Sequence, residues 1–318
     1  MLSNKIKFPL APPSDKESFD DFNLLKQFDP LTIIKSGTWF SRSDFDQSYC
    51  IPYYIDINKT GLKASDRHHW YARMACDSLN SPSPMRNWYQ KKHRLTLENS
   101  KYFKSSPKTA LALRKYIASQ FRPTAALALY SMFKAKRIYD PCGGWGDRLI
   151  AAMAANLEYH CRDTNPLALA GYAAMEHMYD HEKEVSFEYE GAEVNSPEGS
   201  FDFIFTSPPY WKAEKYQGDK SSHVLFKKFD DWLSGFMMPM LKNAWQVLEV
   251  GGHMAINVSD MYGNHTYNKI VQPIINEFSE FNPYVMGYRM AKRVNSRSNL
   301  EGVFGEPIIV IKKTNKET

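Results

Sequence analysis

From residue 137 onward the chain alternates between short apolar segments typical of strands and amphipathic segments typical of helices. We expect strands at 137–142, 157–163, 185–194, 201–207, 253–260, 284–291 and 307–313, and helices at 147–157, 166–180, 228–248 and 270–281. This alternation implies β-α-β units, which form an α/β fold with a doubly wound, mostly parallel sheet. Ligands of such folds bind at the carboxyl ends of the strands. The functional residues are therefore expected in the loops that follow strands.

The earlier part of the chain gives a weaker pattern. Residues 108–121 have helical spacing, and residues 124–133 predict a second helix with Thr124 as its N-cap. The preceding residues are rich in aromatic and turn-forming side chains. We predict an N-terminal accessory region, with a potential role in target recognition, over 1–105 and a catalytic domain over 106–318.

Composition excludes several classes of protein. Hydrophobic residues make up 43% of the 318-residue chain and charged residues 24%, as in ordinary soluble domains. No apolar stretch is long enough for a transmembrane helix, and the N-terminus lacks the apolar core of a signal peptide. The four cysteines show no CxxC spacing, which fits a reducing compartment and argues against a metal cluster. We therefore expect a cytoplasmic protein with no membrane association and no metal.

Positive charge is concentrated in one block. Residues 86–137 contain 13 Lys and Arg but a single acid, Glu98, whereas residues 138–318 carry an excess of acids. Aromatic side chains are interleaved with these cations, a combination that suits phosphate contact and base stacking. The alternative is a solvated face with a few core aromatics. Lys91, Lys92 and Arg94 are the candidate phosphate ligands within the block, and Arg293 belongs to a second basic stretch.

Three features at expected strand ends suggest a nucleotide-like ligand. The segment from Asp140 to Asp147 follows a strand, and its glycines Gly144 and Gly146 would allow close approach of a ligand. Asp163 ends the next strand, where an acid can accept hydrogen bonds from ribose hydroxyls. Glu193 follows the third strand and could accept from an adenine amino group. Helix capping and a surface position are the alternatives for the two acids.

The segment Ser207-Pro208-Pro209-Tyr210 is the most informative. It follows the apolar strand FDFIFT, and its two prolines have fixed φ angles and no N–H donors. A planar amine at this loop could donate one hydrogen to Ser207 Oγ and the other to a backbone carbonyl such as that of Pro208. Tyr210 offers a ring for stacking a base.

These segments resemble the motifs of the S-adenosylmethionine-dependent DNA amino-methyltransferases of bacteria and phages, which act on adenine N6 or cytosine N4. DPCGGWG is similar to the family's cofactor motif, TSPPYW to its catalytic motif, and FRPTAA to the element that closes over the methionine end of the cofactor. The resemblance implies a class I Rossmann-like fold, S-adenosylmethionine as cofactor, DNA as substrate and a role in restriction–modification. It also implies a set of cofactor-binding residues: Asp140, Pro141, Cys142, Gly144, Gly146, Asp163, Glu193, Arg122 and Thr124.

The chain departs from the family in having no sizeable insertion for target recognition. Only 17 residues separate Tyr210 from the helix expected at 228. Trp211, Glu214 and Tyr216 are candidates for contact with the target base. An RNA-base methyltransferase, a protein-glutamine methyltransferase and a catalytically silent nucleic-acid-binding subunit are the alternative functions. The choice between adenine and cytosine, the target sequence, and a homodimer or a separate recognition partner stay open.

Overall fold

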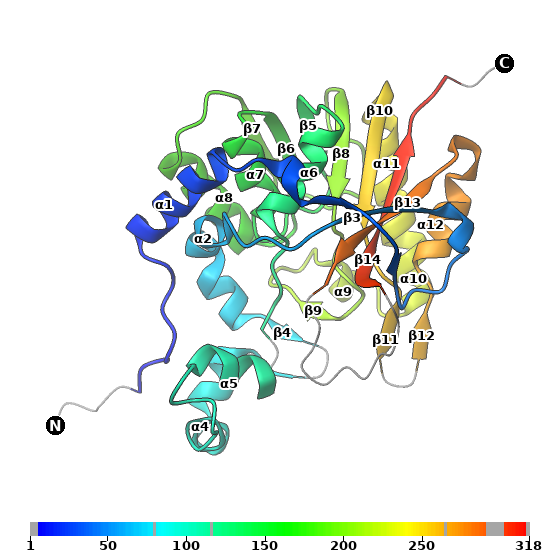
Figure 1. The fold of residues 1–318 in the computed structure, drawn as a ribbon. Helices are drawn as coiled ribbons and strands as arrows, with labels where there is room; N and C mark the ends of the chain where they lie inside the picture. Colours follow the sequence, from blue (N-terminus) through cyan, green and yellow to red (C-terminus); the bar gives the residue numbers. More distant parts are fainter. Residues whose placement is uncertain (1–5, 79–80, 115–116, 264–265, 291–301, 316–318) are drawn as a thin grey trace.

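The computed structural model describes residues 6–78, 81–114, 117–263, 266–290 and 302–315, and it is built around one large twisted sheet (Figure 1). The strands follow one another across the sheet in the order β1 (Ile34–Ser36), β3 (Cys50–Ile55), β13 (Tyr284–Arg289), β14 (Val303–Lys312), β10 (Leu248–Asn257), β8 (Phe201–Thr206), β5 (Arg137–Asp140), β6 (Glu158–Arg162) and β7 (Val185–Glu188). A short strand, β2 (Trp39–Phe40), pairs with β14.

The strand directions identify the fold. The five strands from β10 to β7 are parallel, whereas β14 is antiparallel to both of its neighbours, β10 and β13. The chain proceeds outward from β5 to β7 and then returns to β8 on the other side of β5. This is the class I Rossmann-like methyltransferase fold, so the predicted fold class is confirmed. The reversal of strand order beside β5 creates the crevice in which such folds bind their ligands.

Helices cover both faces of the sheet. Those that pack with one face are α1 (Asp15–Lys26), α2 (Leu62–Ala75), α6 (Pro123–Met132), α7 (Asp147–Ala154) and α8 (Pro166–Met178). The opposite face is covered by α10 (Phe229–Trp232), the π-helical turn η3 (Leu233–Met237), α11 (Met238–Val247) and α12 (Val271–Glu277). Short 3₁₀ segments are η1 (Pro30–Ile33), η2 (Gln47–Tyr49) and η4 (Ser279–Phe281). None of the helices in the described ranges is both long and apolar enough to span a bilayer.

Several expected boundaries are wrong for identifiable reasons. The helix expected at 228–248 is divided by η3, because Pro239 has no N–H to donate one turn back. Strand β10 begins at Leu248 rather than after the Gly251-Gly252 pair. The two glycines lie within the strand, where the pairing of β10 with β8 shifts register between Leu248 and His253. Helix α6 begins at Pro123 with Arg122 as its N-cap, so Thr124 is not the cap.

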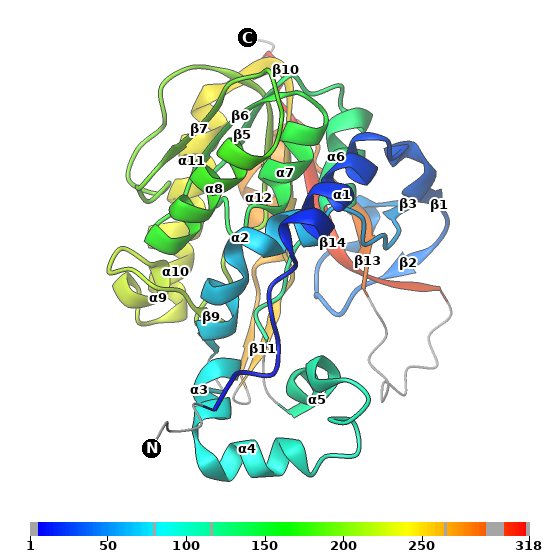
Figure 2. The ribbon, with the colours of Figure 1, turned by 90° about the vertical axis from the view of Figure 1, so that its left-hand side faces the viewer.

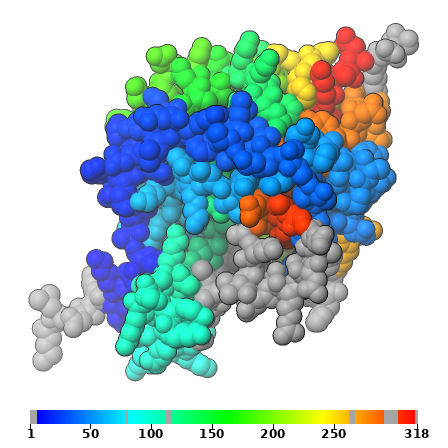
Figure 3. All heavy atoms as spheres, viewed as in Figure 1, coloured from blue at the N-terminus to red at the C-terminus, as the bar shows by residue number. Residues whose placement is uncertain are grey.

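Residues 84–114 form a small helical unit, called here the helical module. It contains α3 (Pro84–Tyr89), α4 (Lys91–Glu98) and α5 (Pro107–Arg114). Its core joins Trp88, Leu97 and Leu111 to Trp70 of α2 and to Phe8. Figures 2 and 3 show the module projecting below the body of the molecule. The helix expected at 108–121 therefore ends early, since Arg114 is the last residue of α5 and residues 117–121 are not helical.

The N-terminal region contributes to the same sheet as the catalytic motifs. Strand β3 pairs with β13 in parallel and β1 pairs with β3, so both extend the sheet beyond its C-terminal strands. Strand β4 (Asp77–Ser78) pairs with β9 (Glu214–Lys215), which follows the SPPY loop. The hairpin of β11 (Met261–Gly263) and β12 (Thr266–Asn268) and the short helix α9 (Ser222–Leu225) complete the elements. A division at residue 105 stays a prediction.

Candidate active site

The two principal motifs lie side by side because their strands are neighbours. The loop from Pro141 to Gly146 follows β5, and the loop from Ser207 to Tyr210 follows β8. Strands β6 and β7 lie beyond β5 and bring Asp163 and the loop of Glu193 to the same edge. The carboxyl edge of the sheet thus gathers residues from four parallel strands.

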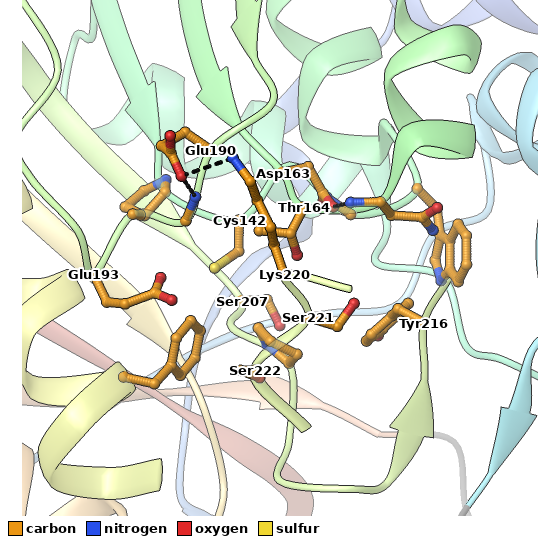
Figure 4. Close-up of a pocket in the computed structure, with 18 residues that line it drawn as sticks. Cys142, Asp163, Thr164, Glu190, Glu193, Ser207, Tyr216, Lys220, Ser221 and Ser222 are labelled. Carbon is orange, nitrogen blue, oxygen red and sulfur yellow. Dashed lines mark hydrogen bonds and ion pairs between the residues drawn. The ribbon is translucent and has the colours of Figure 1, made fainter. Parts of the chain in front are cut away.

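A cavity with an empty volume of about 600 Å³ opens between these loops (Figure 4). Its walls include Pro141, Cys142, Gly144, Asp163 and Glu193, all of which the sequence places in the cofactor set. Ser207 and Pro209 of the SPPY loop close one end. We call this space the cofactor cavity.

Asp163 is anchored at the wall of the cofactor cavity. Its Oδ2 accepts a hydrogen bond of 2.8 Å from the Gly144 backbone N–H, and its Oδ1 accepts one of 2.8 Å from the Asn165 N–H. Burial raises the pKa of Asp163 to about 6, and these backbone donors oppose the rise. The carboxylate therefore orients the glycine loop and also borders the space where a ribose would bind.

Glu193 supplies a buried acceptor that the described residues leave unused. Its Oε2 is buried without a hydrogen-bond partner in the described part of the chain, and burial raises the pKa of the carboxyl. Glu190 lies nearby, where it accepts from Lys220 Nζ at 3.2 Å and from the Gly191 N–H at 3.1 Å. An unpartnered acceptor in a cavity of this size fits a ligand that carries an amino group, as the adenine of S-adenosylmethionine does.

Other members of the predicted cofactor set do not line this cavity. Asp140 is fully buried behind the loop, where it accepts from Arg148 Nε at 2.6 Å and from the Tyr159 hydroxyl at 2.5 Å. Gly146 packs closely against His69 of α2 and Met175 of α8. A Cβ atom added at Gly146 would lie 2.9 Å from each of these side chains. These two residues hold the loop from behind, and their cofactor-binding role stays a prediction.

The FRPTAA segment lies beside a second cavity, and its expected role at the methionine end of the cofactor stays a prediction. Thr124 is fully buried, and its Oγ1 donates to the Asn58 carbonyl at 3.2 Å. Arg122 lines a second cavity rather than the cofactor cavity. The segment therefore borders the space next to the cofactor cavity, not the cofactor cavity itself.

The second cavity is wider, with an empty volume of about 1430 Å³. Ser207, Pro209, Gly144, Trp145 and Tyr216 line both cavities, so the two spaces meet at the SPPY loop. The remaining residues of the loop, Pro208 and Tyr210, line only the second cavity. We call this space the target cavity.

Tyr210 and Trp211 hold the SPPY loop in different ways. The Tyr210 hydroxyl accepts a hydrogen bond of 3.0 Å from the Ser259 N–H. Trp211 lines neither cavity. Its Nε1 donates to the Phe226 carbonyl at 3.2 Å, and Lys212 Nζ lies 4.3 Å from the centroid of its ring. Trp211 thus supports the loop, whereas Tyr210 borders the target cavity.

Glu214 and Tyr216 are more deeply placed than solvated loop residues. Glu214 is buried at 9% exposure and lines the target cavity. Its Oε1 accepts from the Ser119 N–H at 3.2 Å, and its Oε2 accepts from the Tyr216 hydroxyl. The Tyr216 ring packs against Trp145, with centroids 5.4 Å apart. Both residues form part of the cavity wall, as their proposed contact with a base requires.

The target cavity also contains residues that sequence reasoning did not identify. They are Gln120, Asp147, Asn257, Tyr288 and Glu306. Arg289, which belongs to the second basic stretch, also lines this cavity. Asp147 accepts from Ser65 Oγ and from Gln120 Nε2, and burial raises its pKa to about 7. Glu306 directly precedes the strand expected at 307–313, and an acid at that position was the available signal; in the structure it lies within β14.

The predicted phosphate ligands lie outside both cavities. Lys91 and Lys92 begin α4 and are exposed, with no ion pair among the described residues. Arg94 differs, because its side chain is only 13% exposed, lies 4.0 Å from Glu98 and donates to the Trp88 carbonyl at 3.3 Å. Arg293 lies outside the described residues. Within the described ranges, no group of three His, Cys, Asp or Glu side chains could hold a metal ion.

Comparison with known proteins agrees with this geometry. Residues 201–318, which contain the SPPY loop and all the following strands, match the family model described as DNA methylase. No curated protein sequence matches the chain.

Solved structures with similar folds include an rRNA methylase from Streptococcus thermophilus, at 14% identity and a TM-score of 0.40 over 62% of this chain and 100% of that one. Another is a SAM-dependent O-methyltransferase from Thermotoga maritima, at 14% identity and a TM-score of 0.42 over 66% of this chain and 72% of that one.

The strand order, the reversed β14 and the cavity at the switch point define the class I Rossmann-like methyltransferase fold. The chain's C-terminal 118 residues match the DNA methylase family.

Proposed function

We propose that the protein transfers a methyl group to the exocyclic amine of a flipped base in DNA, either adenine N6 or cytosine N4. The observation that carries the proposal is the junction of two cavities at Ser207 and Pro209. One cavity has the depth and acidic residues that suit a nucleoside cofactor. The other begins on the far side of the SPPY loop and would receive the target base.

The cofactor would be held by residues of the cofactor cavity. Asp163 would accept from the ribose hydroxyls, and Glu193 from the adenine amino group. The backbone of Gly144 would allow close approach, since this residue has a φ of +62° that other residues rarely adopt. When bound, S-adenosylmethionine supplies a methyl group on a positively charged sulfonium.

Ser207 and the SPPY backbone would activate the amine. The lone pair of an exocyclic amine is delocalised into the base, so the nitrogen is a poor nucleophile. Accepting both N–H hydrogens at Ser207 Oγ and the Pro208 carbonyl would favour a pyramidal nitrogen with a localised lone pair. The localised lone pair would be directed at the methyl group that the cofactor would supply in place of its bond to sulfur, and the amine proton would leave to water. Positioning and electrostatics carry this reaction, with no covalent intermediate.

Tyr210 would stack on the target base after the base leaves the duplex. Its ring borders the target cavity, and its hydrogen bond with Ser259 restricts the orientation of the ring. Cys142 has no catalytic part in this reaction, since burial raises the pKa of its thiol and its Sγ packs 3.4 Å from Met240 Sδ.

The helical module is the proposed contact with DNA phosphates. Lys91 and Lys92 of α4 are exposed on the module, as are Lys104 and Lys108 near α5. The module projects from the side of the molecule where β9 lies, and β9 follows the SPPY loop along the chain (Figure 2). Not all of the basic block belongs to this surface, because Lys136 and Arg137 lie at the opposite edge of the sheet, where Arg137 pairs with Glu249. This function fits a modification enzyme in the cytoplasm of a bacterial or phage-infected cell.

The test is to incubate the protein with S-adenosylmethionine carrying a deuterated methyl group and with duplex DNA, single-stranded DNA or RNA, followed by mass spectrometry of the nucleosides. The proposal expects deuterated N6-methyladenine or N4-methylcytosine from DNA. Labelled nucleosides from RNA alone would instead support the RNA-base alternative. Label on protein glutamine would support the protein-methyltransferase alternative.

A further inference from the structure

Glu306 lies in the target cavity but has no part in the chemistry described above. Strand β14 places it directly opposite Tyr288 of β13, and Asn257 of β10 pairs with Ile308, two residues along β14. Because side chains alternate along a strand, Glu306, Ile308 and Asn257 point to the same face of the sheet. That face carries Phe205 and the wall of the target cavity.

The sheet order sets the separation of Glu306 from the SPPY loop. Ser207 follows β8, whereas Glu306 lies on β14, and β10 runs between these two strands. Two strand spacings amount to roughly 10 Å. A base whose amine is held at Ser207 would therefore extend its ring across Asn257 toward Glu306. Both residues line this cavity with Tyr210, the proposed stacking ring.

The environment of Glu306 favours its neutral form. The carboxyl is partly buried and forms no ion pair with any cation in the described ranges. Burial raises its pKa to about 7, and the Asn257 amide, its hydrogen-bond partner, opposes the rise. The other charged or titratable groups that line the cavity are Tyr288 and Arg289 of β13, Tyr210, Tyr216, Arg122, Arg148, Asp147 and Glu214, and Arg148 is paired with Asp140. Arg289 is paired with Asp56 at 2.8 Å.

The chemistry of the base determines what such a group can do. Once both amine hydrogens are accepted at the SPPY loop, the polar atoms left on the ring of adenine or cytosine are acceptors. A carboxylate has only acceptors and would repel them, whereas a carboxylic acid has one O–H donor. The group that satisfies a ring acceptor at this position is therefore a protonated carboxyl.

We propose that Glu306 is a binding residue for the target base, which it recognises as a carboxylic acid donating a hydrogen bond to a ring acceptor. This inference rests on the proposed function, because it takes an amine at Ser207 as its starting point. It adds a recognition contact at the far end of the base and makes binding of the target sensitive to pH.

The experiment measures kcat and KM for DNA between pH 6 and 8.5 for the wild type, Glu306→Gln and Glu306→Ala. For the wild type, we expect the KM for DNA to rise about tenfold per pH unit above roughly pH 7, as the donor is lost. Glu306→Gln keeps an N–H donor and does not titrate, so its KM for DNA should be low and independent of pH. Glu306→Ala should have a raised KM at every pH, by about tenfold.

Two controls separate the explanations. Cofactor affinity and thermal unfolding should be similar in all three proteins at pH 6, which checks folding. Asp147 titrates in the same pH range and lines the same cavity, so Asp147→Asn should retain the wild-type rise in KM.

Some results would overturn the inference while leaving the function intact. One is a wild-type KM that does not change with pH; another is a Glu306→Ala variant with normal KM. A rate that rises through pH 7 and is lost in Glu306→Gln would make Glu306 a proton acceptor instead. Absence of any methylated DNA base from the wild type would contradict the proposed function itself.

Discussion

The cofactor cavity and the target cavity share the SPPY loop but differ in their polar groups. In the cofactor cavity, the glycine loop is held by Asp163, and Glu193 presents an unused acceptor. In the target cavity, Asp147 and Glu306 both have pKa values raised to about 7. The first arrangement is preorganised for a ligand that is the same in every turnover. The second has two acids whose pKa values lie near 7, whereas the pKa of Asp163 in the first is about 6, so the two cavities respond to different ranges of pH.

Replacing Ser207 should have the largest effect, because this residue lines both cavities and, in the proposed mechanism, accepts a hydrogen bond from the reacting amine. We expect Ser207→Ala to lower kcat by about 10²–10³-fold through loss of one acceptor. Cofactor affinity, measured by calorimetry, should change less than about threefold. Ser221→Ala is the matched control, since Ser221 lines only the cofactor cavity and donates to the Gln217 carbonyl. Loss of cofactor binding in Ser207→Ala would place the serine in the cofactor site alone.

Replacing Asp163 should affect the cofactor cavity and leave the target cavity unchanged. We expect Asp163→Ala to weaken cofactor binding roughly 10- to 150-fold, which corresponds to about 1.5–3 kcal/mol for a charge-assisted acceptor. Wild-type affinity should rise as the pH increases through about 6, because the carboxylate form accepts the ribose hydroxyls. Asp163→Asn preserves the shape and should remove the pH dependence. An unchanged dissociation constant in both variants would exclude Asp163 from the site.

A change outside both cavities should alter binding of DNA without altering the chemistry. For Lys91→Ala with Lys92→Ala, we expect the slope of log affinity against log salt to become shallower by about 2. Methyl transfer at saturating DNA should be unchanged. Lys136→Ala with Lys312→Ala is the control, because these exposed lysines lie at the opposite edge of the sheet. Equal slopes in the α4 variant and the wild type would show that this surface is only solvated.

The smallest expected effect concerns stability. The folded-state pKa of Asp147 is raised from 3.8 to about 7, so the folded protein holds this proton more tightly than the unfolded chain does. The resulting stabilisation is fully present below about pH 4 and is lost as the pH rises through about 7. Asp147→Asn should therefore reduce the fall in melting temperature between pH 5 and pH 8, by roughly 2–4 °C. An identical fall in both proteins would contradict the assignment.

Sequence reasoning was most successful where local chemistry and position coincide. The order of strands and helices after residue 137 predicts the sheet, and the SPPY and glycine loops lie side by side at its carboxyl edge, as the sequence indicates. Sequence reasoning failed where contacts between distant parts of the chain determine the environment of a residue. Nothing local reveals that Asp140 is held by Arg148 and Tyr159, or that Arg94 is largely buried and donates to the Trp88 carbonyl of α3.

The target cavity illustrates the same limit. Gln120, Asn257 and Glu306 come from segments far apart in the chain, and only the sheet brings them together. The basic block was also divided by the fold, since its last residues begin β5 at the edge opposite the helical module. A run of like charges along a sequence therefore does not define one surface.

The central claim, that the SPPY loop separates a cofactor cavity from a target cavity, is tested most directly by a crystal structure with S-adenosylhomocysteine. The account predicts that the adenine amino group lies at Glu193, that the ribose hydroxyls lie at Asp163 and that the sulfur faces Ser207. The space beside Glu306 should contain no part of the ligand. A ligand that instead occupies the space between Arg122, Asn257 and Glu306 would contradict the division on which the mechanism rests.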